Sequence, residues 1–475
     1  MAKKHNHVDF ILKWSNHEDL SLAREKVNEL TERLIQETGQ GLDLTEADLS
    51  DCRLGGLNLR RAKLNRARLY RTDLSYANLA EATLICPGME RTNLKGANLK
   101  GAYVHALAAQ VCNFQGTDLS NLVDATGSIF HGCYMSAVKA SHSIFAGSTF
   151  YQCDLENSDF SGSNLQGCSI NECILDNANL SAALLSQTTI TKCRMQGAVL
   201  NRATGKGLVL QSLSSCDELQ LIDADLPSLR CDSLSGSEID AEGLKARNAD
   251  FNECSFSGVK FSQATLSNSR WQSCHIDRGD FNEAKLDVAS FSNCSLVETN
   301  LERVMAENLR VIECRLPKAK MSGFAGRSAL FRDCNLSGAD LSKAYLYRAI
   351  FTGDPARGMC MRDVDLQDAI LVQAYITADL RKANLRGASC AYARLNNCNM
   401  QGANLSGVNV YGASLVKTDL TDSQLTGVEI PFFADRCPGL LTALEHSATP
   451  ASLSSMVSYL SSLEKLLLES QNSST

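Results

Sequence analysis

Residues 47–81 read, in groups of five, ADLSD CRLGG LNLRR AKLNR ARLYR TDLSY ANLAE, and the same rhythm continues to Val104. In almost every group a small residue is followed two positions later by Leu, as in Ala47 and Leu49 or Ala62 and Leu64. An α-helix has a period near 3.6 residues and a flat strand a period of 2, so neither keeps a five-residue apolar pattern on one side. The backbone must therefore turn a corner in every repeat.

A second period, of twenty residues, accompanies the first. If five residues form one side of a square, four groups complete a turn, and the next turn stacks on it at a strand spacing of roughly 4.8 Å. Cysteines recur at this interval in two runs, Cys133, Cys153, Cys173 and Cys193, then Cys254, Cys274, Cys294, Cys314 and Cys334. The two periods together predict a four-sided coil of stacked turns.

The repeat resembles A(D/N)LxX, the pattern of the pentapeptide-repeat family, from about Leu44 to Ile430. The resemblance implies an all-β solenoid, a right-handed quadrilateral β-helix in which the middle Leu or Phe and the small residue before it point inward. An uncapped solenoid end exposes apolar core and strand edges. We therefore expect α-helical N- and C-terminal caps on this coil.

The composition fits a narrow core of small and aliphatic side chains. Only 6% of the residues are aromatic, and the formal net charge of −7 over 475 residues indicates neither a nucleic-acid binder nor a strongly acidic mimic. Of the nineteen cysteines, those in the two runs stand where Ala, Ser, Thr or Val stand in other repeats. We interpret them as small buried fillers and expect no disulfides, metal or cofactor.

Targeting signals are the next property that the sequence addresses. The segment MAKKHNHVDF has no apolar core of a signal peptide, and no apolar run approaches the ~20 residues of a membrane span. The sequence therefore predicts a cytoplasmic protein, with a secreted effector that lacks a classical signal peptide as the alternative.

The regularity of the repeat suggests five segments. They are an N-terminal helical cap (1–40), a first β-helix segment (41–200), an irregular repeat or loop segment (201–250), a second β-helix segment (251–430) and a C-terminal segment (431–475). In residues 201–250 the spacing slips, so either the coil continues with loops or it divides there.

Each end of the chain carries an amphipathic pattern. Between Leu20 and Leu34 apolar residues recur at helical intervals up to Gly39, and Ser15 and Glu18 have capping-box spacing, which predicts a capping helix. Apolar residues at three- and four-residue intervals mark a C-terminal helix followed by a disordered tail: Leu453, Met456, Leu460, Leu463 and Leu467. That helix either caps the coil or pairs with a second copy to form a homodimer.

Basic residues gather at outward positions of the first turns, on adjoining sides of the square. This basic collar consists of Arg60, Arg61, Lys63, Arg66, Arg68 and Arg71. An acidic partner could bind it, or the collar could be a solvated face balanced by Asp48, Asp51 and Asp73. Only two tyrosines accompany the collar, so the pattern gives little support to direct binding of nucleic acid or membrane.

No catalytic or metal-binding motif stands out. The eight histidines are scattered without paired-ligand spacing, and Asp and Ser are abundant because the repeat and its corners favour them. We therefore predict a non-enzymatic protein–protein interaction scaffold with a partner of unknown identity, a rigid rod acting through its surface, loops and end helices. The family resemblance adds two alternatives, a DNA mimic that binds and protects or inhibits DNA gyrase, and a bacterial effector that binds a host protein or membrane.

Overall fold

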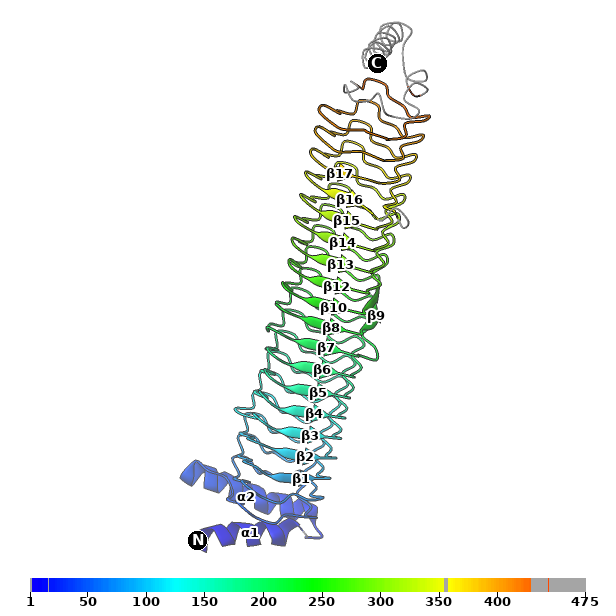
Figure 1. The fold of residues 1–475 in the computed structure, drawn as a ribbon. Coiled ribbons are helices and arrows are strands. Elements are labelled where there is room, and N and C mark those ends of the chain that lie inside the picture. The colour runs from blue at the N-terminus through cyan, green and yellow to red at the C-terminus, as the bar shows by residue number, and fades with distance from the viewer. Residues whose placement is uncertain (1, 16, 354–357, 429–442, 444–475) are drawn as a thin grey trace, which may run out of the picture. The chain divides into compact units, whose positions relative to one another are not determined.

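The computed structural model describes residues 2–15, 17–353, 358–428 and 443 (Figure 1). The chain divides into two compact units, Met1–Arg270 and Trp271–Thr475. Each unit is described by itself.

The coil of the first unit has four sides, each held by its own ladder of parallel bridges. One ladder starts with Asp43 and Lys63, the next with Asp48 and Arg68, and the other two with Arg53 and Asn58, each residue bridging the one twenty positions later. The middle residue of each group and the residue two before it are buried, so the core is a stack of apolar side chains inside the square. The predicted four-sided parallel β-helix is confirmed.

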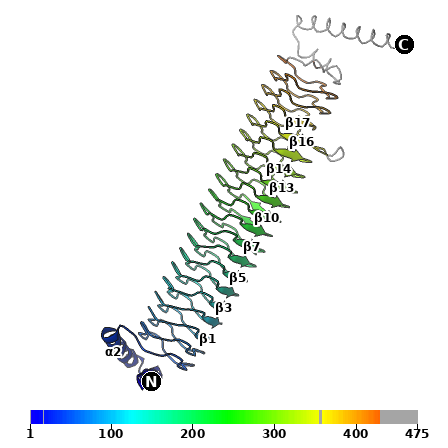
Figure 2. The same ribbon diagram turned by 60° about the vertical axis from the view of Figure 1, so that its left-hand side comes forward.

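One side of the square is regular enough to form short strands, which stack in parallel register in the first unit (Figure 2). These strands are β1 (Gly88–Glu90), β2 (Ala108–Gln110), β3 (Ile129–His131), β4 (Thr149–Tyr151), β5 (Ser169–Asn171), β6 (Thr189–Thr191), β7 (Val209–Gln211), β8 (Arg230–Asp232) and β10 (Asp250–Asn252). A neighbouring side carries the pair β9 (Ser235–Ser237) and β11 (Ser255–Ser257), and β12 (Arg270–Gln272) lies at the boundary of the units.

At the corners of the coil the backbone adopts a left-handed conformation. Along most of the coil the second residue after the buried middle position has a positive φ, for example 57° at Arg61, 57° at Arg66 and 54° at Arg71. This left-handed conformation turns the chain by one corner and is costly for side chains with a Cβ. Three members of the basic collar therefore project from corners rather than from flat sides.

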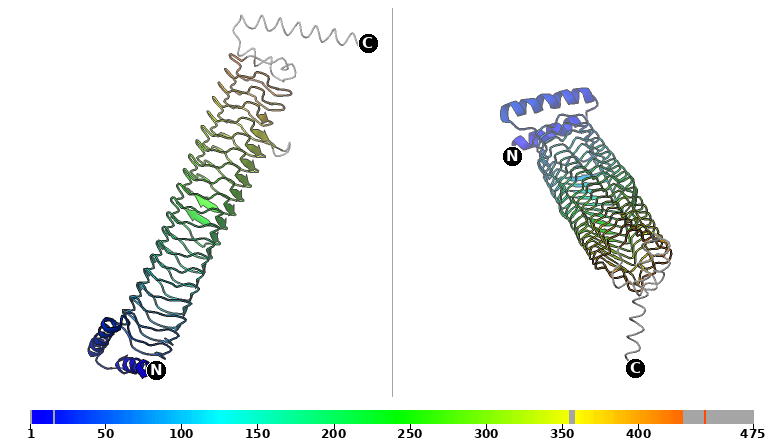
Figure 3. Two further views of the ribbon diagram at one scale, coloured as in Figure 1. Left: turned by 90° about the vertical axis from the view of Figure 1, so that its left-hand side faces the viewer. Right: turned by 90° about the horizontal axis from the view of Figure 1, so that it is seen from above.

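Two helices cover the N-terminal end of the coil, α1 (Ala2–Ser15) and α2 (Leu20–Thr38) (Figures 1 and 3). Ala23, Val27 and Thr31 form the buried stripe of α2, and the Thr31 hydroxyl donates a 2.8 Å hydrogen bond to the Asn58 carbonyl at the exposed edge of the first turn. The helix thus covers the apolar core and also satisfies an edge group. The predicted N-terminal helical cap is confirmed.

The start of α2 differs from the prediction. The N-cap is Asp19, whose carboxylate accepts hydrogen bonds from the backbone N–H groups of residues 21 and 22, and not the predicted Ser15. Ser15 ends α1 and its hydroxyl donates to the Leu12 carbonyl at 3.1 Å. The helix does end where predicted, at Gly39 with a φ of 71°.

The coil continues through residues 201–250, where the sequence pattern is least regular. The bridges Thr204 to Asp225 and Asp225 to Lys245 carry one ladder through this stretch. In several of its repeats the large residue has moved to the first inward position and a small residue occupies the middle, as in Leu234 with Gly236, Ile239 with Ala241 and Leu244 with Ala246. Because both positions point inward, exchanging their sizes keeps the core filled.

The second unit repeats the same four-sided construction. Its strands pair in parallel and are β13 (Ser290–Ser292), β14 (Arg310–Ile312), β15 (Leu330–Arg332), β16 (Ile350–Thr352) and β17 (Tyr375–Ile376). The residues proposed for a C-terminal helix, between Leu453 and Leu467, lie outside the described residues, and so does the question of whether they cap or dimerise.

Candidate functional site

The structure distributes the basic collar over three sides of the square. Lys63 and Arg66 belong to the side that begins with Asp43, and Arg68 and Arg71 to the side that carries β1–β8. Arg60 and Arg61 belong to the side that begins with Asn58. The six side chains therefore lie on three consecutive sides of the coil, leave the side that begins with Arg53 without a member, and do not form one flat patch.

Two of these arginines share one carboxylate. The Arg60 Nη2 atom lies 2.6 Å from Glu81 Oε1, and the Arg61 Nε atom lies 2.7 Å from Glu81 Oε2. Hydrogen bonds from Arg60 and Arg61 lower the pKa of the Glu81 carboxyl, and the same carboxylate raises the pKa of Arg60. The positive charge on this side is largely matched within the protein.

Other collar residues also have partners. Arg71 Nε lies 3.0 Å from Asp51 Oδ1, and Lys63 Nζ donates to Gln40 Oε1 at 2.7 Å. Arg68 is less tightly held, because its guanidinium approaches Asp48 only to 4.0 Å and its side chain is 79% exposed. Arg68 is thus available for an external partner.

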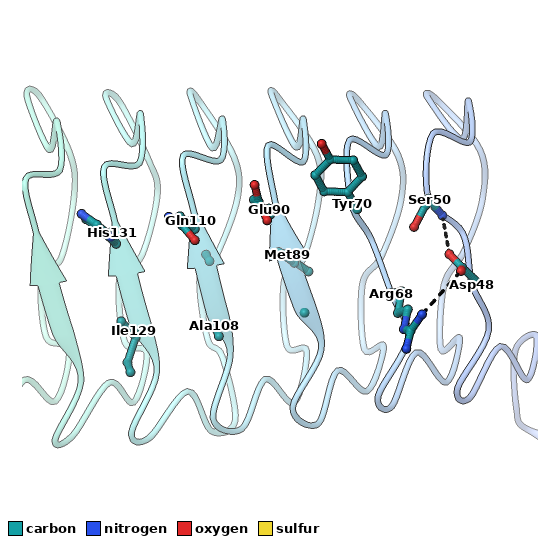
Figure 4. Close-up of a pocket in the computed structure, with 12 residues that line it drawn as sticks. Asp48, Ser50, Arg68, Tyr70, Met89, Glu90, Ala108, Gln110, Ile129 and His131 are labelled. Carbon is teal, nitrogen blue, oxygen red and sulfur yellow. Dashed lines mark hydrogen bonds and ion pairs between the residues drawn. The ribbon is translucent and has the colours of Figure 1, made fainter.

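Arg68 also borders a shallow open groove of about 550 Å³ on the first unit (Figure 4). The groove follows the side of the coil that carries β1–β3. Its lining residues are Asp48, Ser50, Arg68, Tyr70, Gly88, Met89, Glu90, Ala108, Ala109, Gln110, Ile129 and His131.

Small residues in one outward column create this groove. The column runs from Arg68 through Gly88 and Ala108 to Ile129 on neighbouring turns. A Cβ atom on Gly88 would have no other atom within 4 Å, so open space lies above it. The two small residues form a floor between the long side chains at each end.

A second outward column forms the polar wall, with Tyr70, Glu90, Gln110 and His131 on successive turns (Figure 4). No cation among the described residues forms an ion pair with Glu90. Ile129 is 52% exposed at the opposite border. The groove therefore offers a small apolar floor, one loosely held cation and one unpaired carboxylate, which suits a partner's side chains of mixed chemistry.

Sequence reasoning placed Arg68 in the collar but missed the groove. Gly88 lies in CPGME, and the small Ala108 stands twenty positions later. The register of β1 on β2 pairs the two, as the twenty-residue period predicts. Aligning the outward residues at twenty-residue intervals would have revealed the floor.

The cysteine columns are buried, and their geometry is that of packing groups. The Cys153 backbone N–H donates to Cys173 Sγ at 3.3 Å, and Cys153 Sγ lies 3.3 Å from the Phe130 carbonyl oxygen. Burial raises the pKa of the Cys168 thiol to about 12 and does the same for Cys334. A thiol with so high a pKa stays protonated at neutral pH and is a poor nucleophile.

Two features that would indicate other functions are a metal-binding cluster and a membrane-spanning helix among the described residues. No cluster of three or more His, Cys, Asp or Glu side chains with the geometry to hold a metal ion occurs among them. None of the helices described there is long and apolar enough to cross a membrane.

Comparisons with known proteins concern the repeat itself. A family model described as "Pentapeptide repeats (8 copies)" matches residues 43–79, 62–101, 133–171, 163–202, 327–353, 360–402, 378–415 and 403–430. A second, "Pentapeptide repeat region", matches residues 244–321. No curated protein sequence matches the chain.

Several solved structures are similar to the chain. HetL, a pentapeptide repeat protein involved in heterocyst differentiation regulation in the cyanobacterium Nostoc sp. strain PCC 7120, is 21% identical over 57% of this chain and 90% of HetL, with a TM-score of 0.20. QnrB1, a plasmid-mediated fluoroquinolone resistance protein, is 19% identical over 46% of this chain and 97% of its own, with a TM-score of 0.22. Rfr23 from the cyanobacterium Cyanothece 51142 is 25% identical over 27% of this chain and 89% of its own, with a TM-score of 0.19.

Proposed function

Because the chain belongs to the pentapeptide-repeat family, we propose that it is a non-enzymatic scaffold that binds a protein partner through the groove on β1–β3. The rigid coil holds the lining residues in fixed register, so little ordering is required when the partner binds. The candidate functional residues are then surface side chains and not catalytic groups.

The observation that carries this proposal is the groove floor of Gly88 and Ala108 between Arg68 and Ile129. The backbone N–H and C=O groups beneath it are used by neighbouring turns, as in the bond from Gly88 N–H to the Ala67 carbonyl oxygen at 3.3 Å. A partner is therefore recognised by side chains and not by adding a strand. Arg and aromatic residues, here Arg68 and Tyr70, are enriched at protein interfaces.

The chemistry of the lining defines the partner. A small or flat apolar group fits over the floor, an acidic group pairs with Arg68, and a basic group pairs with Glu90. The rest of the basic collar, most of which lies on two other sides of the coil, would act on the rate of encounter, because exposed charges steer association more than they add affinity.

The gyrase alternative requires a continuous anionic stripe along the coil. Acidic side chains between Asp118 and Asp250 are instead shared among the sides of the square, and several are paired, as Asp176 is with Arg194 and Asp240 with Lys260 at 3.6 Å. This arrangement favours the groove over the stripe as the binding surface. The effector alternative concerns delivery and is compatible with the same groove.

Filling the groove tests the proposal. Ala108→Arg places a long side chain on the floor, while Ser169→Arg places the same side chain in the same outward column on β5, beyond the groove. Tagged forms of both variants and the unmodified protein would be used to recover partners from lysate of the cells that make the protein, with mass spectrometry as readout. We expect the same protein to be recovered with the unmodified form and with Ser169→Arg, and to be lost with Ala108→Arg.

A third variant separates the groove from the collar. Reversing the collar residues other than Arg68 to Glu should reduce recovery more at low than at high salt, because screening removes long-range steering. Equal recovery of the partner by Ala108→Arg and the unmodified protein would refute the groove as the binding site. Loss of recovery only on reversing Asp and Glu between Asp118 and Asp250 would favour the DNA mimic.

A further inference from the structure

The second unit exposes an apolar stripe that the repeat pattern does not require. Outward positions of the repeat are mostly polar, yet eight large apolar or aromatic side chains among the described residues here are between 38% and 69% exposed: Val288 at a corner, and seven further along the coil. We call these seven the aromatic stripe: Met305, Tyr345, Ile350, Ile370, Tyr375, Tyr392 and Tyr411. Contiguous exposed apolar surface of this kind marks an interaction site.

The stripe is continuous from one turn to the next. Met305 bridges Ala325, Ala325 bridges Tyr345, and Tyr345 bridges Ile370, so these residues lie on adjacent strands of one side. Around the next corner Ile350 pairs with Tyr375 in the register of β16 on β17. The stripe therefore follows the coil axis across one side and its corner.

Ring contacts occur beside Tyr345 and between Tyr392 and Tyr411, which lie on the same side of the coil in the two turns after Ile370. The Tyr345 and Tyr347 rings stack with centroids 6.4 Å apart, and Tyr392 meets Tyr411 edge to face at 5.5 Å. These contacts order the aromatic side chains without burying them, which prepares a surface for a partner at small entropic cost.

Positive charge lies along the stripe. Arg327 and Arg348 lie over the Tyr347 ring at 5.8 and 5.1 Å, and Arg394 is exposed beside Tyr375. Glu307 approaches Arg327 at 3.9 Å and is the acidic group that faces this cluster. An apolar partner with acidic side chains would complement the surface.

We infer that the aromatic stripe is the docking surface for the C-terminal segment of the same chain, residues 453–469. This segment carries Leu453, Met456, Leu460, Leu463 and Leu467 at helical intervals and has Glu464 and Glu469 among its few charges. As a helix it would present an apolar layer roughly every 5 Å, which matches turns stacked at roughly 4.8 Å. Glu464, which borders the apolar face of such a helix, would lie beside the arginines of the stripe.

Chain length permits this docking. The last described turn ends at Val428, one turn after Tyr411, and residues 429–452 then separate it from Leu453. A chain of that length reaches up to roughly 80 Å when extended. The stripe spans roughly 24 Å from the turn of Met305 to that of Tyr411. A helix formed by residues 453–469 would have the same length to within a few ångströms. The segment can therefore reach every part of the stripe.

Photo-crosslinking tests the inference in the full-length protein. Tyr375 is replaced by p-benzoylphenylalanine, and the crosslinked peptides are identified after irradiation of a mixture of ¹⁴N- and ¹⁵N-labelled protein. We expect position 375 to crosslink to residues 453–469 of the same chain, so that both crosslinked peptides carry the same isotope label. The same crosslinker at Tyr134, which is exposed in the first unit, should give none to this segment.

Variants of the segment give a second readout without touching the coil. Leu460→Asp should lower the crosslink yield by about tenfold or more, because a buried Leu contributes more than a tenfold factor to such an equilibrium. Ser461→Asp, its matched control, should leave the yield within about twofold, because an exposed substitution changes stability little. Absence of crosslinks to 453–469 would overturn the inference, and crosslinks between ¹⁴N- and ¹⁵N-labelled chains would replace it with docking onto a second copy.

Discussion

Phe324 and Gly326 form an exchanged repeat whose energetics can be tested directly. In most repeats a small residue precedes a large middle one, whereas here the large Phe324 comes first and Gly326 occupies the middle. Both are buried, and Phe324 has no exposed surface. A Cβ atom on Gly326 would lie 3.0 Å from Phe324 Cδ1, closer still to Cε1, and 3.2 Å from Leu346 Cδ2. The Phe324 ring therefore fills the volume that Leu fills elsewhere.

The two single substitutions should each be costly. Phe324→Ala leaves a cavity and should lower the free energy of unfolding by about 3–5 kcal/mol. Gly326→Leu overpacks the core beside an intact ring and should lower it by about 1–3 kcal/mol. Together, Phe324→Ala/Gly326→Leu restores the common order of the repeat and roughly conserves volume, so the double variant should lose less than about 1.5 kcal/mol.

The assay is a double-mutant cycle by urea unfolding, followed by far-ultraviolet circular dichroism. Hydrogen exchange at the Tyr345 N–H, which bonds to the Phe324 carbonyl oxygen at 2.8 Å, reports locally on the same turn. The cycle predicts a coupling free energy of about 2.5 kcal/mol or more in favour of the double variant. A control cycle of Phe324→Ala with Leu405→Ala, several turns away, should be additive within about 0.5 kcal/mol. Additive losses at Phe324 and Gly326 would refute the view that the two inward positions share one volume.

Three further predictions concern the first unit. Asp19→Ala should lower the free energy of unfolding by about 1 kcal/mol through loss of the N-cap of α2, measured by thermal unfolding, while Asp19→Asn should retain most of it. Two arginines lower the pKa of the Glu81 carboxyl from its usual 4.5. Their ion pairs with Glu81 therefore add to the free energy of unfolding, by less than about 1 kcal/mol for an exposed pair. This stabilisation is complete above pH 4.5 and disappears as the pH falls through the pKa of Glu81 in the folded protein. Comparing Glu81→Gln with the unmodified protein in a series of decreasing pH from 7 checks this, since the difference in their free energies of unfolding should shrink as the Glu81 carboxyl becomes protonated. Exposed Cys86 should react rapidly with a thiol reagent at pH 8, whereas buried Cys168 should react only after denaturation, and equal rates at the two sites would contradict its burial.

Much of the fold could be predicted from the sequence because one physical constraint repeats. A chain that must bury two residues in every five and turn a corner each time has few solutions, and the stretch beginning at Ala47 states that constraint without interruption. The same constraint fixes which residues point outward, so the placement of collar residues such as Arg60 and Arg68 on different sides of the square followed from numbering alone.

Other features depended on sizes and registers that the pattern does not state. Residues 201–250 looked irregular because one turn there holds an extra residue, so that Val209 pairs with Arg230, and because residues such as Leu234 and Leu244 stand at the position normally held by a small one. The period places Gly88 beside Ala108, but the groove also depends on the small size of both outward residues between Arg68 and Ile129, which the repeat pattern does not specify. The ion pairs of Arg60 and Arg61 with Glu81 form because two turns stack, which brings residues about twenty positions apart into contact.

The most direct test of the account is the affinity of the groove for the partner recovered with the unmodified protein. Biolayer interferometry would compare the unmodified protein, Ala108→Arg and Ser169→Arg at physiological salt. The account predicts that Ala108→Arg weakens binding by about tenfold or more, as expected when a central contact of an interface is blocked, while Ser169→Arg leaves it unchanged. Unchanged affinity of Ala108→Arg, with melting behaviour equal to that of the unmodified protein, would contradict the claim that the chain acts through this groove.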